Sequence, residues 1–163
     1  MNEFASKELS KLLRTKELRF RTGILLLTRA WFSREAEVSA YLDVEHVDLT
    51  KWKLNRVPLD RRYLDIRWET LVEDLSTIVN DNKVYGQCIL ISNVDLFVAA
   101  LPFEDRLRFW DFMRTTFRRP RGLILSFPAE SPHLLQDDER QKWEISGRIA
   151  SWRGGALDVN TTY

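Results

Sequence analysis

The chain has 163 residues, enough for one domain with a substantial core, because folding buries about 70% of the surface of an unfolded chain of this size. Hydrophobic residues make up 44% and charged residues 30%, with a net charge of +1, which excludes a disordered or strongly polarised chain. No apolar run approaches the roughly 20 residues that span a bilayer. We therefore expect one cytosolic domain over residues 1–163, without membrane contact.

The first half of the chain alternates short apolar runs with segments of helical period, and the alternation predicts both strands and helices. The leading segment, residues 1–20, is expected to be an amphipathic helix that precedes the core in the chain. The predicted elements of this half are a helix at 3–14, a buried strand at 23–28, a helix at 36–42 and a weaker strand at 44–49.

The second half continues the alternation with stronger patterns. One helix starts near Pro58 and Asp60, carries an apolar stripe from Leu64 to Val79, and stops at Asn80. The remaining predicted elements are a fully apolar strand that opens residues 86–97, a helix between Pro102 and Pro120 with Leu107, Trp110, Met113 and Phe117 on its buried face, a strand at 121–127, and a last helix carrying Ile145, Ile149 and Trp152.

Alternating helices and nearly all-apolar strands are typical of a parallel sheet that is covered on both faces. We predict an α/β fold of three layers, mainly parallel, with its core at 21–155 and a tail at 156–163. Right-handed crossovers place the carboxyl ends of all strands at one edge, which holds the ligand site in such folds. Function is therefore expected after Leu27, Ile91 and Leu125.

The loop "TRAWFSRE" (28–35) follows the first predicted strand and is the first candidate site. A phosphate-binding loop has two glycines, whose backbone N–H groups surround phosphate, then a lysine and a hydroxyl residue that holds magnesium. On this frame Thr28 and Ser33 replace the glycines, Arg34 the lysine and Glu35 the hydroxyl residue. A carboxylate there repels each phosphate charge by about 4 kcal/mol at about 4 Å. We expect neither ATP nor magnesium to bind.

Two aromatic residues of this loop, Trp31 and Phe32, either pack inward in an ordinary connection or lie exposed for a partner. Trp52 is also predicted to lie in a loop. Because tryptophan is frequent among interface hot spots, we identify Trp31, Phe32 and Trp52 as candidate contacts for another protein subunit.

The other two strand ends carry weaker candidates. Ser92 stands where a P-loop ATPase has a magnesium-binding carboxylate, and the first acid, Asp95, comes three residues later. Serine alone is a poor ligand for a hard dication, and Asp95 fits better as a cap of the following turn. Ser126 can contact a γ-phosphate or only the local backbone. A small active site built from Asp95, Ser126 and Arg34 is an alternative that requires these groups to converge.

Arginines are concentrated between residues 106 and 121, which provides a nucleic-acid-binding alternative. If helical spacing gathers them on one surface, the segment can bind the phosphate backbone of DNA. Otherwise they form ordinary pairs with nearby acids. The arginines concerned are Arg106, Arg114, Arg118, Arg119 and Arg121.

Metal and nucleophilic chemistry have no support in the sequence. His46 and His133 lack companions at ligand spacing, so no metal site is expected. Cys88 stands inside an apolar run and is predicted to be a buried hydrophobic residue. No G-x-S-x-G motif occurs in the chain.

The middle of the chain resembles the BrxF family, the small P-loop-fold subunits of type 3 BREX phage-defence systems, which are relatives of AAA-type ATPases. The segments that carry the resemblance are "LNRVPLDRRYLDIRWETLVEDL" (54–75), "ILISNVDLF" (89–97) and "GLILSFP" (122–128), within about residues 20–155. The resemblance implies a P-loop NTPase-like (AAA- or RecA-like) fold and an interaction role in a multi-protein antiviral system.

This sequence departs from that family at both nucleotide motifs. Where a glycine-rich Walker A and an acidic Walker B are expected, it has "TRAWFSRE" and Ser92. No catalytic residue can therefore be carried over, and we expect a subunit that does not hydrolyse nucleotide. The remaining alternative within the resemblance is weak nucleotide binding or ATPase activity at a site without the consensus residues.

Overall fold

The computed structural model describes residues 3–14, 20–57, 60, 66–81, 86–131 and 133–152, with the backbone alone for residues 3–6. The predicted tail at 156–163 and the helix start near Pro58 and Leu64 lie outside the described residues. The helix itself is described from Trp68 onward.

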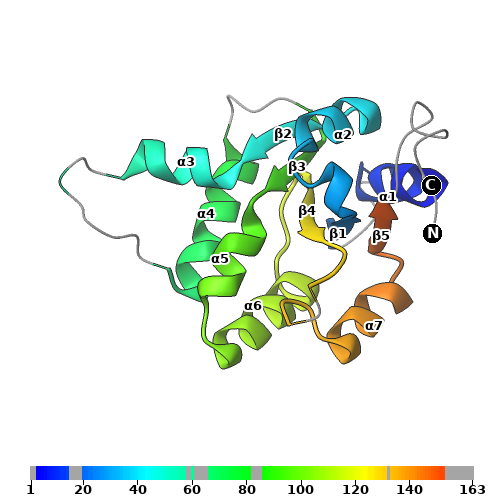
Figure 1. The fold of residues 1–163 in the computed structure, drawn as a ribbon. Coiled ribbons are helices and arrows are strands. Elements are labelled where there is room, and N and C mark those ends of the chain that lie inside the picture. The colour runs from blue at the N-terminus through cyan, green and yellow to red at the C-terminus, as the bar shows by residue number, and fades with distance from the viewer. Residues whose placement is uncertain are drawn as a thin grey trace.

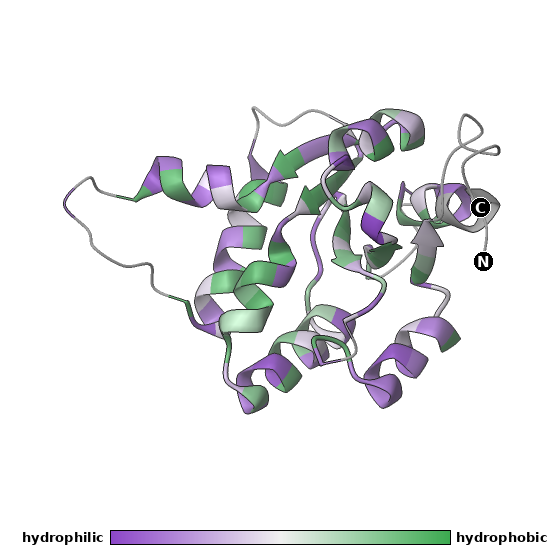
Figure 2. Ribbon diagram, in the orientation of Figure 1, coloured by the Kyte–Doolittle hydropathy of each residue, from purple (hydrophilic) through white to green (hydrophobic). Residues whose placement is uncertain are grey.

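In the described part of the chain, five parallel strands form one sheet in the order β2-β3-β4-β1-β5 (Figure 1). The α/β architecture with a parallel sheet is therefore as predicted. The strands are β1 (Thr22–Leu27), β2 (Glu45–Asp48), β3 (Cys88–Ser92), β4 (Gly122–Pro128) and β5 (Ile149–Trp152). Figure 2 shows that β1, β3 and β4 are mainly hydrophobic, whereas α7 (Asp137–Ile145) is mostly hydrophilic.

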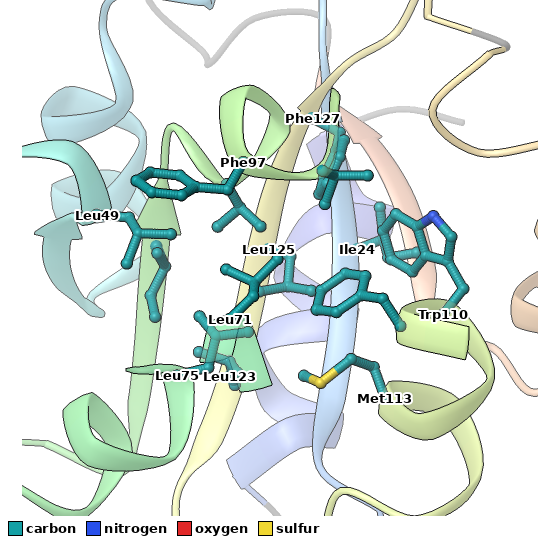
Figure 3. Packing of buried hydrophobic residues seen from close by; sticks show 14 of the residues in the cluster. Ile24, Leu49, Leu71, Leu75, Phe97, Trp110, Met113, Leu123, Leu125 and Phe127 are labelled. Carbon is teal, nitrogen blue, oxygen red and sulfur yellow. The ribbon is translucent and has the colours of Figure 1, made fainter. Parts of the chain in front are cut away.

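Helices cover both faces of the sheet. Successive residues of a strand point to opposite faces, so one strand contributes side chains to the clusters on both sides. Leu25 and Leu27 join the cluster under α1 (Glu3–Arg14) and α2 (Glu35–Leu42). Ile24 and Leu26 join the larger cluster on the other face (Figure 3). The helices that contribute to this larger cluster are α3 (Leu49–Arg56), α4 (Trp68–Asn80), α5 (Val94–Ala100), α6 (Phe103–Thr115) and α7.

The prediction of a single last helix through Ile145, Ile149 and Trp152 is wrong. Helix α7 ends at Ile145, which is 80% exposed, and Gly147 (φ 69°) turns the chain into β5. Ile149 and Trp152 are both buried, but in different clusters. Residues three apart suggest a helix face, yet in a strand they point to opposite faces, and here both faces are covered.

Two further expectations need correction. Trp52 lies in α3 and not in a loop, because Asp48 Oδ1 accepts hydrogen bonds from the backbone N–H of Thr50 (3.0 Å) and Lys51 (3.3 Å) and starts a helix there. In α6, Leu107 is exposed. The buried side chains of that helix are Phe109, Trp110 and Met113.

Candidate functional site

The candidate site is the edge of the sheet where the parallel strands end. The connection from β1 runs through α2 on one face, whereas the connection from the neighbouring β4 runs through α7 on the other. Ligands of α/β sheets bind where adjacent strands send their connections to opposite faces. The loop at 28–34 therefore occupies the position that the fold favours for a ligand.

This loop is a compact turn that begins with the 3-10 helix η1 (Arg29–Trp31). The backbone N–H of Trp31 donates to the carbonyl of Thr28 (2.9 Å), that of Phe32 to Arg29 (3.3 Å) and that of Arg34 to Trp31 (3.0 Å). A phosphate nest needs successive N–H groups that point toward the anion. Here these three donors are used inside the loop.

Trp31 is buried at the centre of the loop, with 7% of its surface exposed. Its ring meets Trp152 of β5 edge to face, with centroids 5.6 Å apart, and half-buried Phe32 packs against the same cluster. Trp31 is therefore not the exposed partner contact that the sequence suggested. Partner binding through Phe32 and Trp52 stays a prediction.

Arg34 and Glu35 flank the start of α2, and both have defined surroundings. The guanidinium carbon of Arg34 lies 4.0 Å from the centroid of the Trp31 ring, and its nitrogens donate to both carboxylate oxygens of Glu37 (3.1 and 2.6 Å). Glu35 is buried, and this burial raises the pKa of its carboxyl group, with smaller contributions from nearby carboxylates. The position of a phosphate-binding lysine is thus taken by Arg34, which already pairs with Glu37. The position of the hydroxyl residue is taken by the buried Glu35.

A hydrogen-bonded polar cluster joins the ends of β2 and β3. His46 Nε2 lies 2.8 Å from Ser92 Oγ, and Asn93 Nδ2 donates to Asp48 Oδ1 (2.9 Å). Ser92 thus lies at the predicted edge but bonds to a histidine. Sequence reasoning missed His46, Asp48 and Asn93, because their bonds join residues 46 and 45 positions apart. An aspartate directly before the polar segment at 49–56 was the available indication, since aspartate is a common helix cap.

Asp95 and Ser126 complete the predicted set at this edge. Asp95 is buried in the first turn of α5, and its Oδ1 has no hydrogen-bond partner within the described structure. Burial raises the pKa of this carboxyl group. Ser126 Oγ donates to the backbone carbonyl of Ile91 (3.3 Å). Ser126 and Arg34 thus each have another hydrogen-bond partner, and the active site built from them and Asp95 stays a prediction.

The described residues give no support to metal binding or to thiol chemistry. Within them, no three or more His, Cys, Asp or Glu side chains are placed to hold a metal ion. Cys88 is buried, and burial raises its pKa to about 12. Its thiol is therefore protonated at neutral pH and is a poor nucleophile.

The arginines of the predicted nucleic-acid face point to different partners. Helix α6 ends at Thr115, so helical spacing does not extend to Arg118, Arg119 and Arg121. Arg114 Nε donates to Glu139 (2.8 Å). Other contacts of these arginines include Arg106 to the His133 carbonyl (2.9 Å), Arg119 to Ser76 Oγ (2.7 Å) and Arg121 to the Asp81 carbonyl (2.9 Å). These contacts weigh against one continuous phosphate-binding surface.

Comparison with known proteins does not assign the chain to a family. Neither a protein-family model nor a curated protein sequence matches it. Over the described ranges, none of the helices has the length and apolar composition needed to cross a membrane.

Proposed function

We propose that this chain is a non-hydrolysing subunit with a P-loop-like fold that acts through protein contacts in a multi-protein, BREX-like antiviral system. One observation carries the proposal: in the loop after β1, three N–H groups, those of Trp31, Phe32 and Arg34, donate to carbonyls of the same loop, and Trp31 lies in the core. The resemblance of the segments at 54–75, 89–97 and 122–128 to the BrxF family supports the defence context.

Nucleotide binding at this loop has a calculable cost. For an anion to bind the N–H groups of Trp31, Phe32 and Arg34, the η1 turn must open, and Trp31 then leaves its contact with Trp152. Removing a buried tryptophan side chain from a core typically costs about 3–5 kcal/mol. Since each 1.4 kcal/mol is tenfold in affinity, the opening alone weakens binding by roughly two orders of magnitude or more. At any pH at which buried Glu35 is ionised, its carboxylate also repels the phosphates of the nucleotide.

Calorimetric titration with Mg·ATP and Mg·ADP tests the nucleotide part. We expect no binding below about millimolar concentration, in line with the opening cost. Micromolar binding would overturn the proposal. So would ATP turnover that is abolished by Arg34→Ala and kept by Arg29→Ala, a matched control on an exposed arginine of the same loop.

The interaction part is tested in the native host. Deleting the gene should increase the plating efficiency of phage. The tagged chain should also copurify with proteins encoded beside its gene. Unchanged phage resistance in the deletion strain contradicts the defence context. A chain that never copurifies with its gene neighbours contradicts the subunit role.

A further inference from the structure

We propose that the groove between α4 and α6 docks a partner segment in which a large apolar side chain stands beside a lysine or arginine. The proposal rests on the proposed function, because it names the surface through which an interaction subunit would bind. The groove is open and has a volume of about 590 Å³. It is lined by side chains of α4, by Phe112 of α6 and by Arg119.

An aromatic pair forms the apolar part of the groove. Trp68 and Phe112 have ring centroids 5.9 Å apart, with their planes tilted by 55°. Both rings are partly buried and pack against the larger core cluster, while they also line the groove beside Val72. The core therefore fixes one side of each ring and leaves another side accessible, which suits an aromatic interface anchor.

Two carboxylates give the groove its charge preference. Glu69 and Glu73 stand one helical turn apart, are exposed and line the groove. Neither forms an ion pair in the described structure, whereas the nearby Asp74 pairs with Lys53 (2.7 Å). Two unpaired acids next to aromatic rings favour a cationic side chain, whose aliphatic stem covers a ring while its head reaches a carboxylate.

Arg119 adds one positive charge against the two carboxylates, so the groove keeps an excess of negative charge, and its guanidinium is held in place. Its Nε donates to Ser76 Oγ (2.7 Å), its Nη1 donates to the carbonyl of Arg118 (2.8 Å), and its Cζ lies 4.6 Å from the centroid of the Phe117 ring. The arginine is thus a fixed part of the groove lining. An incoming basic and apolar segment meets the two free carboxylates, whereas an acidic segment is repelled by them.

Selection from displayed peptides tests the chemistry of the occupant. Short random peptides are selected on the full-length chain, with counter-selection on Trp68→Ser. We expect enriched sequences that combine Lys or Arg with Leu, Phe or Trp. No difference between the wild type and the Trp68→Ser chain, or enrichment of acidic sequences, overturns the proposal.

A fluorescein-labelled peptide of the enriched sequence is then titrated by anisotropy. The double change Glu69→Gln and Glu73→Gln affects exposed positions, so the fold should persist. We expect it to weaken binding about tenfold or more and to reduce the salt dependence. The charge-matched control, Glu104→Gln with Asp137→Asn, changes two exposed acids outside the groove and should leave affinity unchanged. Equal loss in both double variants overturns the proposal.

Light scattering separates a partner from a second copy of the chain. A dimer that dissociates in the Glu69→Gln, Glu73→Gln variant would make the occupant another copy and overturn the partner proposal. The groove is built by α4 and α6, and the nucleotide titration reports on the loop after β1. Failure of the docking proposal is therefore distinguishable from failure of the proposed function.

Discussion

Trp31, in the turn after β1, packs edge to face against Trp152 of β5, with ring centroids 5.6 Å apart. Tyr41 of α2 meets the same Trp152 ring at 5.0 Å. Three elements are therefore joined through one aromatic cluster beside the carboxyl ends of β1 and β5. The turn is held by core packing at the position where a phosphate-binding loop must stay open.

Replacing Trp31 by alanine should destabilise the protein strongly. Loss of a buried tryptophan typically costs about 3–5 kcal/mol, and chemical denaturation measures it. Trp52→Ala is the matched control, because Trp52 is half-buried and stacks on Arg56 (4.6 Å), so about 1–2 kcal/mol is expected. If Trp31→Ala cost under about 1 kcal/mol, the ring would not belong to the core, and the exposed-contact interpretation would return.

The strands could be predicted from the sequence because burial on both faces makes them continuously apolar, as in β3 and β4. The parallel arrangement also placed Ser92, Asp95 and Glu35 near one edge. The sequence left open whether Trp31 packs inward or lies exposed, because a tryptophan in a polar loop is buried only if distant residues such as Trp152 cover it. For the same reason the bond between His46 and Ser92 was invisible.

Asp95→Asn should increase stability at neutral pH more than at acidic pH. Burial raises the pKa of Asp95 above the unfolded value of about 4, so the folded state binds the proton more tightly. The wild type therefore loses stability as pH rises from the pKa of Asp95 in the unfolded state through its higher pKa in the folded state. The Asp95→Asn variant does not, because its side-chain amide does not titrate. Denaturation midpoints of both proteins across this range measure the difference.

The nearby Asp48→Asn serves as a comparison for Asp95→Asn, because its Oδ1 accepts three hydrogen bonds, from Thr50, Lys51 and Asn93. Loss of its charge should weaken these bonds and destabilise the protein at neutral pH. If Asp95→Asn showed the same destabilisation, or a gain independent of pH, the buried carboxyl of Asp95 would not carry the predicted cost.

Gly122→Ala should cost more than Gly23→Ala. A Cβ at Gly122 would lie 2.6 Å from the backbone carbonyl oxygen of Leu13 in α1, which cannot move without shifting the helix. At Gly23 the nearest atom, at 2.9 Å, is the end of the flexible Leu9 side chain. We expect a loss of about 1–3 kcal/mol at Gly122 and less at Gly23. Equal losses in chemical denaturation would show that α1 does not approach the sheet this closely.

Arg148 links β1 to α6 from a buried position at the start of β5. Its guanidinium donates to the backbone carbonyls of Thr22 (2.7 Å), Arg114 (2.8 Å) and Met113 (3.4 Å), and its Cζ lies 4.5 Å from the centroid of the Trp143 ring. The side chain is thus a planar donor that satisfies carbonyls from two elements at once. A lysine has one compact head group and cannot match this geometry.

Arg148→Met should therefore destabilise the protein by about 3 kcal/mol or more, because each buried carbonyl left unpaired costs about 1–3 kcal/mol. Arg148→Lys should fall between this variant and the wild type. Arg140→Met is the control: Arg140 pairs with Glu144 (3.2 Å) on the surface of α7, so its loss should stay within about 0.5 kcal/mol. Chemical denaturation of the wild type and the three variants measures these differences in the free energy of unfolding. If Arg148→Met matched Arg140→Met, solvent would be satisfying these carbonyls, and Arg148 would not hold α6 to the sheet.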